Sequence, residues 1–330
     1  MDSLAALVPR DRFLPLCPET NAGGAPRRAG IEIEFGGLTE AEAARVVADA
    51  LGGRVHEKTA HELVVEGTDW GAVEVCLDTI WREKAGGKLA DLGLDLSRAV
   101  VPVEIVTPPL APGHLPALDR LRGALREAGA QGSRDGLLLG FGLHLNPEVA
   151  AETLDTILPV ARAFALIEDW LRKADPIDPA RRVLPFVDPW PRRLVDRLAG
   201  EAAGWDLAAF IDAYLAETPT RNRGLDLLPL FRHLDADRVG GVLEGAGGLV
   251  SARPTFHYRL PDCRIDEPGW RIAYDWNRWV MVERLAADTA ALDRLASDWL
   301  AYRGALTTMR GDWFAHLEER LDALALWETR

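Results

Sequence analysis

The chain has 330 residues, of which 48% are hydrophobic and 27% are charged, an ordinary composition for a globular protein. Its 51 aspartates and glutamates outnumber its 38 lysines and arginines, which gives a formal net charge of −13. Because an acidic surface repels phosphate backbones and anionic lipids, we expect neither nucleic acid nor a membrane as the main partner.

The first regular element is expected to follow a short N-terminal arm. Residues 1–29 end in ETNAGGAPRRA, where small residues and a proline prevent regular structure. The run GIEIEF (30–35) then has the alternation of a strand. No linker composition appears after the arm, so we predict one large domain over residues 30–330, with a helical C-terminal part.

A helix and a hairpin are predicted next. Thr39 and Glu42 form a capping-box pattern that opens a helix, which ends at Gly52. The runs HELVVEG (61–67) and AVEVCLD (72–78) alternate apolar and polar residues and are separated by TDWG, which indicates a hairpin.

Further strands and helices complete the first half. A polar, helix-prone stretch (87–99) precedes the strand VPVEIVT (101–107), and leucines at helical spacing predict a helix over 114–129. The apolar run GLLLGFGLHLN (136–146) predicts a strand, and a long helix is expected over 148–173. This order of elements is α+β and not a strict β-α-β repeat.

The second half is predicted to be mainly helical. Repeated proline breaks over 175–191 indicate an extended loop, and helices are expected at 191–200 and 206–217. TFHYRLPD (255–262) has the pattern of a strand, and residues 277–328 are expected to be largely helical.

The cysteines and the missing motifs narrow the class of protein. Cys17, Cys76 and Cys263 lack zinc-ligand or redox spacing, so we expect a reducing, cytoplasmic setting. The N-terminus has no apolar core of signal-peptide length, and no stretch approaches the roughly 20 apolar residues of a membrane span. The chain has no phosphate-binding loop or dinucleotide fingerprint, so any use of ATP is expected to depend on metal ions.

Two carboxylates on the first strand are the first candidate site residues. Glu32 and Glu34 alternate with Ile31, Ile33 and Phe35, so both acids share one face, roughly 6–7 Å apart. Like charges at this spacing repel each other unless a cation lies between them. A solvated sheet face is the alternative explanation for such a pair.

Two further candidates lie in apolar strands. Glu104 is surrounded by valines and isoleucine, where an unpaired buried carboxylate would cost several kcal/mol. His144 lies in an even more apolar run, and a hydrogen-bonded core histidine is the alternative there. Hard oxygen ligands in this number, with one imidazole, suit Mg²⁺ or Mn²⁺.

Three arginines are candidates for binding anionic groups. Arg221 and Arg223 lie in TRNRG, and Arg259 interrupts an aromatic, branched strand. The planar guanidinium matches the oxygens of a phosphate or carboxylate. Surface ion pairs are the alternative, mainly for Arg221 and Arg223.

Together, the motifs GIEIEF, VEIVTPP, FGLHLN, TRNRG and TFHYRLPD resemble the putative amidoligases related to glutamine synthetase and glutamate–cysteine ligase. They occur in the same order as in that family and span residues 30–262. The resemblance implies a glutamine synthetase-like catalytic domain, with a curved, largely antiparallel sheet backed by helices. It also implies an ATP-dependent ligase that forms an amide or peptide bond through an acyl phosphate.

The resemblance also assigns roles to the candidate residues. The implied metal ligands, for Mg²⁺ or Mn²⁺, are Glu32, Glu34, Glu104, His144 and His257. The implied cofactor-binding residues, for ATP, are Arg223, Arg259 and His144. The implied catalytic residues are Glu34, Arg221, Arg223 and Arg259. The expected substrates are a small-molecule or peptide carboxylate and an amine.

His257 departs from the family pattern, which usually has glutamate at this position. A neutral imidazole supplies one ligand atom without negative charge, so the metal preference or the number of bound ions can differ. This departure leaves open a non-catalytic nucleotide- or metabolite-binding protein of the same fold. The acidic cluster with a metal-bound water leaves open a second alternative, a metal-dependent hydrolase that needs no ATP.

Overall fold

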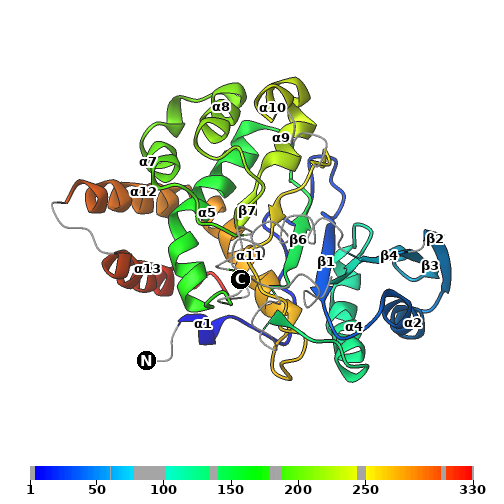
Figure 1. Ribbon diagram of the computed structural model, residues 1–330. Coiled ribbons are helices and arrows are strands. Elements are labelled where there is room, and N and C mark those ends of the chain that lie inside the picture. The colour runs from blue at the N-terminus through cyan, green and yellow to red at the C-terminus, as the bar shows by residue number, and fades with distance from the viewer. Residues whose placement is uncertain are drawn as a thin grey trace, which may run out of the picture.

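The computed structural model describes residues 4–59, 61–77, 102–133, 140–178, 181, 187–243, 250–305 and 310–328. Within these ranges, eight strands form one sheet in the order β2-β3-β4-β5-β1-β6-β8-β7, with antiparallel pairing throughout. Figure 1 shows this curved sheet with α-helices packed around it. The predicted α+β class and antiparallel sheet are confirmed.

The sheet and the helices have the following bounds. The strands are β1 (Ala29–Phe35), β2 (Arg54–Thr59), β3 (Glu62–Thr68), β4 (Gly71–Leu77), β5 (Val103–Val106), β6 (Leu143–Pro147), β7 (Leu225–Asp226) and β8 (His257–Tyr258). The α-helices are α1 (Leu4–Leu7), α2 (Glu40–Leu51), α4 (Pro116–Glu127), α5 (Leu154–Ala174), α7 (Arg192–Gly200), α8 (Leu207–Glu217), α9 (Leu228–Leu234), α10 (Ala236–Val242), α11 (Ile272–Ala287), α12 (Thr289–Gly304) and α13 (Arg310–Leu324).

Strand β1 is central in the sheet, because it pairs with β5 on one side and β6 on the other. Its Ile31, Ile33 and Phe35 are fully buried, as the alternation of the sequence predicts. Their partners Ile105 of β5 and Leu145 of β6 are buried with them. The other residues of β1 therefore direct their side chains to the opposite face of the sheet.

Helices cover the apolar face of the sheet. Tyr258 of β8 packs against Phe164 of α5 at 6.2 Å and against Trp279 of α11 at 5.3 Å between ring centroids. Helix α2 packs on β3 and β4, and α4 packs on α2 and α11. This layer leaves the opposite, polar face of the central strands for a site.

The start of α2 is fixed by the predicted capping box. The Thr39 side chain accepts a hydrogen bond from the Glu42 amide at 3.2 Å, and the Glu42 carboxylate accepts one from the Thr39 amide at 2.9 Å. The helix ends where Gly52 adopts a φ of 75°, a conformation that favours glycine. The predicted helix is confirmed at both ends.

Several elements differ from the sequence prediction. The predicted hairpin is present as β3 and β4, but β2 pairs with β3 as an additional strand. The predicted strand over 255–262 shortens to the two residues of β8, and β7, α9 and α10 were not predicted. Helix α1 lies within the arm that was predicted to have no regular structure. Some predicted elements lie wholly or partly outside the described residues. These are the last residue of the predicted hairpin, Asp78, the predicted helix over 87–99, and parts of the strands predicted over 101–107 and 136–146.

The N-terminal arm is anchored to α11 by polar side chains. The Leu14 amide donates to Asn277 Oδ1 at 2.8 Å, and Asn277 Nδ2 donates to the Arg12 carbonyl at 2.8 Å. Further along the arm, the buried Arg27 guanidinium pairs with the buried Glu283 carboxylate at 2.7 Å. These contacts attach the arm to the core before β1 begins.

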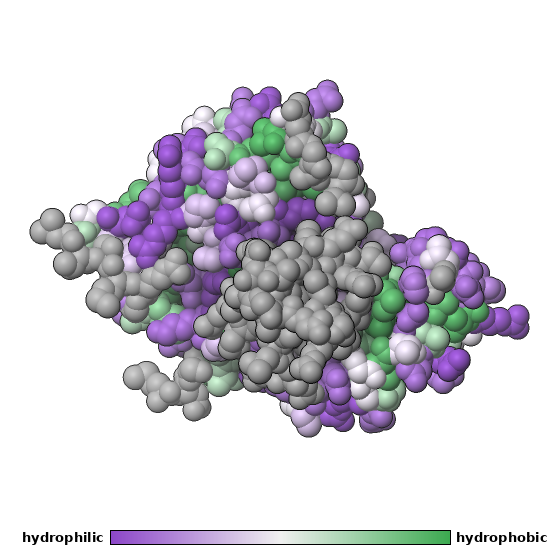
Figure 2. All heavy atoms as spheres, viewed as in Figure 1, coloured by the Kyte–Doolittle hydropathy of each residue, from purple (hydrophilic) through white to green (hydrophobic). Residues whose placement is uncertain are grey.

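The coloured part of the surface in Figure 2 is mainly hydrophilic, in keeping with the acidic composition. Apolar side chains show over the region of α8 to α10 and beside strands β2 to β4. Within the part of the chain that the structure describes, no helix combines the length and the apolar character needed to span a membrane.

Candidate active site

The polar face of the sheet brings together the acidic residues predicted from the sequence. Glu32 and Glu34 lie on this face of β1, and each is only 7% exposed. In the antiparallel ladders, Glu34 lies opposite Glu104 of β5, and Glu32 lies opposite His144 of β6. Residues that are far apart in the sequence thus meet on three adjacent strands.

Glu32 is held by a chain of buried polar side chains. His144 Nδ1 lies 2.8 Å from Glu32 Oε2, and Asn146 Nδ2 donates to Glu32 Oε1 at 3.1 Å. The chain continues to β8, where His257 Nδ1 lies 2.6 Å from Asn146 Oδ1. The rings of His144 and His257 also meet edge to face, with their centroids 5.2 Å apart.

Glu34 and the second nitrogen of His144 meet beside Gly142. The Gly142 amide donates to Glu34 Oε2 at 2.7 Å, while His144 Nε2 lies 3.5 Å from Glu34 Oε1. His144 Nε2 is buried and makes no hydrogen bond to any of the residues that the structure describes. A Cβ atom at Gly142 would come within 2.7 Å of this nitrogen, so glycine leaves the space around it open.

Two overlapping groups of side chains on this face could hold a cation. One consists of Glu32, His144 and His257, and the other of Glu34, Glu104 and His144, with ligand atoms within 4.8 Å of one another in each group. Carboxylate oxygens with an imidazole suit Mg²⁺ or Mn²⁺. The unpaired, buried His144 Nε2 is the atom that a cation in the second group would satisfy.

The charges in the first group match a cation site. Burial raises the pKa of Glu32, but the hydrogen bond from His144 and nearby positive charge, including that of Arg253, outweigh it and hold the pKa well below its usual range. Burial lowers the pKa of His257 well below its usual range. Glu32 is therefore ionised and His257 neutral near pH 7, as metal ligands must be.

Arg259 and Arg221 lie at the β7–β8 side of this face. The buried Arg259 donates through Nη1 to the Arg221 carbonyl at 2.9 Å, and among the described residues its Nε has no hydrogen-bond partner. Burial and the nearby Arg221 lower the pKa of Arg259, while Asp226 and Glu34 oppose this effect. Arg221 in turn pairs with the buried Asp226 at 3.2 Å. These two arginines therefore add positive charge beside the acidic residues.

Arg223 is bound to a neighbouring loop. Its Nε donates to Thr218 Oγ1 at 2.5 Å and its Nη1 to the Pro189 carbonyl at 2.7 Å. Its backbone forms a bridge with Asp188. The predicted contact between Arg223 and a nucleotide stays a prediction.

Four residues of this region were not predicted from the sequence: Asn146, Asp226, Arg253 and Arg181. Asn146 follows His144 by two positions, so the alternation of β6 could have identified it. Arg253 pairs with Glu32 at 2.8 Å across a long sequence separation, and no local pattern indicates this contact. Arg181 lies in the proline-rich segment, where its guanidinium binds Asp262 at 2.7 Å and the carbonyls of neighbouring residues.

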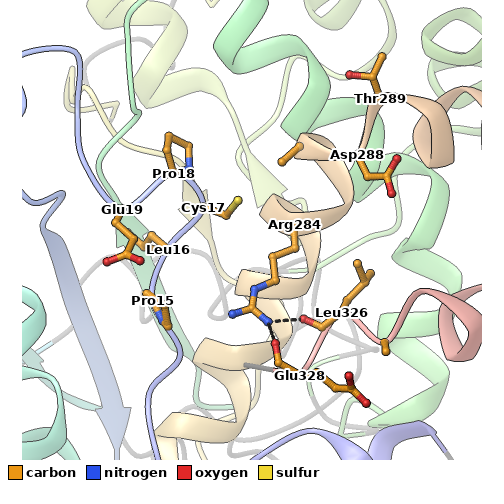
Figure 3. Close-up of a pocket in the computed structure, with 12 residues that line it drawn as sticks. Pro15, Leu16, Cys17, Pro18, Glu19, Arg284, Asp288, Thr289, Leu326 and Glu328 are labelled. Atoms are coloured by element: carbon orange, nitrogen blue, oxygen red, sulfur yellow. Dashed lines mark hydrogen bonds between the residues drawn. The ribbon is translucent and has the colours of Figure 1, made fainter. Parts of the chain in front are cut away.

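A separate cavity lies between the N-terminal arm and the C-terminal tail. Figure 3 shows its lining, with Cys17 and Glu19 of the arm on one side and Arg284 of α11 on the other. Its volume is about 620 Å³, and Arg284 Nη1 donates to the carbonyls of Leu326 and Glu328 at 2.7 and 2.6 Å. None of the predicted site residues lines it, so the chemistry points to the sheet face.

One of the comparisons with known proteins gives a match. A family model described as putative amidoligase enzyme matches residues 25–281, a range that contains all of the site residues described above. No curated protein and no solved structure matches the chain.

Proposed function

The chain belongs to the putative amidoligase enzyme family, and from this membership we propose that it is an ATP-dependent carboxylate–amine ligase with a glutamine synthetase-like catalytic domain. A small-molecule or peptide carboxylate attacks the γ-phosphorus of ATP, which gives an acyl phosphate and ADP. An amine then displaces phosphate from the acyl carbon and loses a proton, so that an amide or peptide bond forms.

The observation that carries this proposal is the cluster of Glu32, Glu34, Glu104 and His144 on one polar sheet face of a family member. Carboxylates placed this close together raise the energy of a protein unless positive charge compensates them. Phosphoryl transfer needs a site that binds cations, because its catalysis depends on positioning the phosphates and on neutralising their charge. The cluster therefore suits a reaction at the phosphates of ATP.

In this proposal the side chains have different roles, which follow from their positions. Glu34, Glu104 and His144 Nε2 would hold one Mg²⁺ or Mn²⁺, and the group of Glu32, His144 and His257 offers a second set of ligands. The cation supplies electrostatic stabilisation of the phosphate oxygens when bound. The Asn146 amide links Glu32 to His257 and keeps the carboxylate in place.

The arginines supply positive charge beside the acidic cluster, since Glu34 lies close enough to Arg259 to raise its pKa. Within the described part of the chain, the guanidinium Nε of Arg259 has no hydrogen-bond partner, although the residue is only 9% exposed. We assign Arg259 and Arg221 to the transferred phosphate, whose negative charge replaces the missing partner. Arg223 belongs to the same proposal as a residue that supports the nucleotide side of the site.

The test is ADP release from ATP and Mg²⁺ in the presence of mixed amino acids and polyamines. The wild type should release ADP only when both a carboxylate and an amine are present. Glu34→Gln should reduce this rate by about 100-fold or more, because it removes a charge from the cation site. The matched control is Glu74→Gln on β4, which removes an exposed carboxylate and should leave the rate unchanged. Loss of activity in both variants alike would contradict the site assignment.

One observation favours a second candidate, a nucleotide-binding protein without ligase activity. His257 stands where the resemblance leads us to expect glutamate, and its lowered pKa keeps it without charge. In that case the protein binds a non-hydrolysable ATP analogue with Mg²⁺ but releases no ADP from ATP with any mixture of substrates. Turnover of a substrate without nucleotide would instead identify a metal-dependent hydrolase.

A further inference from the structure

Arg253 differs from the other partners of Glu32 in its exposure. His144 and Asn146 are 4% and 3% exposed and lie on β6, next to Glu32 in the sheet. The Arg253 side chain is 40% exposed, yet its Nη1 donates to Glu32 Oε1 at 2.8 Å. The guanidinium therefore covers the solvent side of a carboxylate that the sheet holds from behind.

The backbone of Arg253 is fixed while its side chain reaches into solvent. The Arg253 amide donates to the Pro229 carbonyl at 3.0 Å, and the strand β8 begins only at His257. A long, half-exposed side chain on an anchored backbone can exchange one partner for another without moving the fold. Glu32, in contrast, keeps the buried hydrogen bonds from His144 and Asn146 when the guanidinium leaves.

Arg253 and a divalent cation compete for the same carboxylate. The cation group of Glu32, His144 and His257 includes the carboxylate that Arg253 neutralises. Two positive charges on one carboxylate repel each other, so binding of the cation displaces the guanidinium. The displaced guanidinium stays attached to its anchored backbone at the solvent-exposed edge of the cation group, which we call the mouth of the site. Its planar fork matches two oxygens of a carboxylate or phosphate.

We propose that Arg253 is an exchangeable counter-charge: it neutralises Glu32 in the cation-free protein, and it binds an oxyanion of the substrate once a divalent cation has taken Glu32. The inference rests on the proposed function, because it requires a cation at Glu32. It assigns to Arg253 the recognition of a carboxylate or phosphate group at the mouth of the site.

The first experiment measures Mn²⁺ alone, by electron paramagnetic resonance or calorimetry. Arg253→Met keeps the apolar stem and removes the charge, so the variant should bind Mn²⁺ about tenfold more tightly than the wild type. The control is Arg238→Met, which breaks a surface pair with Asp212 at 2.7 Å, close to the 2.8 Å of the Arg253–Glu32 pair, and should bind Mn²⁺ like the wild type. Unchanged or weaker Mn²⁺ binding by Arg253→Met would overturn the inference. A wild type that binds no Mn²⁺ would instead contradict the proposed function.

The second experiment adds oxyanions at saturating Mn²⁺. The probes are a non-hydrolysable ATP analogue and glutamate, measured separately by calorimetry. Arg253→Met should bind at least one of them about tenfold more weakly, opposite in direction to its effect on Mn²⁺. A loss for the nucleotide identifies a phosphate as the partner of Arg253, and a loss for glutamate identifies a carboxylate. If both probes bind Arg253→Met as they bind the wild type, the oxyanion role is refuted.

Discussion

Glu168 of α5 is a buried carboxyl group whose ionisation is disfavoured by the fold. It is 3% exposed, its Oε2 accepts the Trp190 amide at 2.8 Å, and Arg172 lies 3.5 Å from its other oxygen. Burial raises the pKa of Glu168 from 4.5 to about 7, and Arg172 and the Trp190 hydrogen bond oppose this only in part. Trp190 directly follows Pro189, whose carbonyl accepts a hydrogen bond from Arg223. The ionisation of Glu168 therefore affects the loop that holds this predicted site residue.

The raised pKa has a definite effect on stability. A carboxyl group with a higher pKa in the folded state binds its proton more tightly there than in the unfolded chain. The free energy of unfolding therefore falls as the pH rises from 4.5 to about 7, and the loss persists above pH 7. At about 1.4 kcal/mol for each pKa unit, the cost of an ionised Glu168 is about 3 kcal/mol at pH 8.

Glu168→Gln keeps an acceptor for the Trp190 amide and removes the ionisation. In urea unfolding, we expect the variant to be within about 1 kcal/mol of the wild type at pH 5, and about 3 kcal/mol more stable at pH 8. The control Glu201→Gln, in an exposed pair with Arg197, should show no such dependence on pH. If wild type and Glu168→Gln lose stability in parallel between pH 5 and pH 8, the reasoning from burial is refuted.

Three further predictions concern the site and the arm. Gly142→Ala places a Cβ 2.7 Å from His144 Nε2, so the Mn²⁺ affinity measured by calorimetry should fall at least about tenfold. The control Gly123→Ala, with open space at its Cβ, should leave the Mn²⁺ affinity unchanged. His257→Glu adds a buried carboxylate near Glu32, so the melting temperature should fall without a cation and return toward the wild-type value with Mg²⁺. A variant that stays destabilised with Mg²⁺ would show that His257 is no ligand. Asn277→Ala removes the hydrogen bonds to the arm and should lower the free energy of unfolding in urea by about 2–4 kcal/mol, and an unchanged value would show that the arm is not anchored there.

The sequence predicts those parts of the fold whose signals are local. The alternation around Glu32 and Glu34 predicts β1 and the face of both acids, because side chains in a strand alternate. Thr39 and Glu42 predict the start of α2, because the capping box needs only neighbouring residues. These predictions do not depend on the rest of the chain.

Elements without such signals were missed. Strand β2 is exposed along its whole length, so its sequence RVHEKT carries no apolar alternation, and pairing with β3 alone defines it. The segment around β8 was predicted too long because the chain after Tyr258 joins β6 only at separate positions, such as the Leu143 amide to the Pro261 carbonyl. Pro261 has no amide hydrogen to continue the ladder. Arg253 reaches Glu32 only through the tertiary fold, so local reasoning could not find it.

The register of the central strands gives the strongest physical argument for a ligand on this face. Alternation places Glu104 on a strand face, but only pairing between β1 and β5 puts it directly opposite Glu34. Like charges directly opposite each other destabilise a sheet, and a shift of β5 by one residue would turn Glu104 away from Glu34 to the apolar side. A register that serves stability alone would separate these two carboxylates, whereas a bound cation requires them together with His144 Nε2. The strain of the pairing is therefore the expected cost of a site that is stabilised when a cation binds.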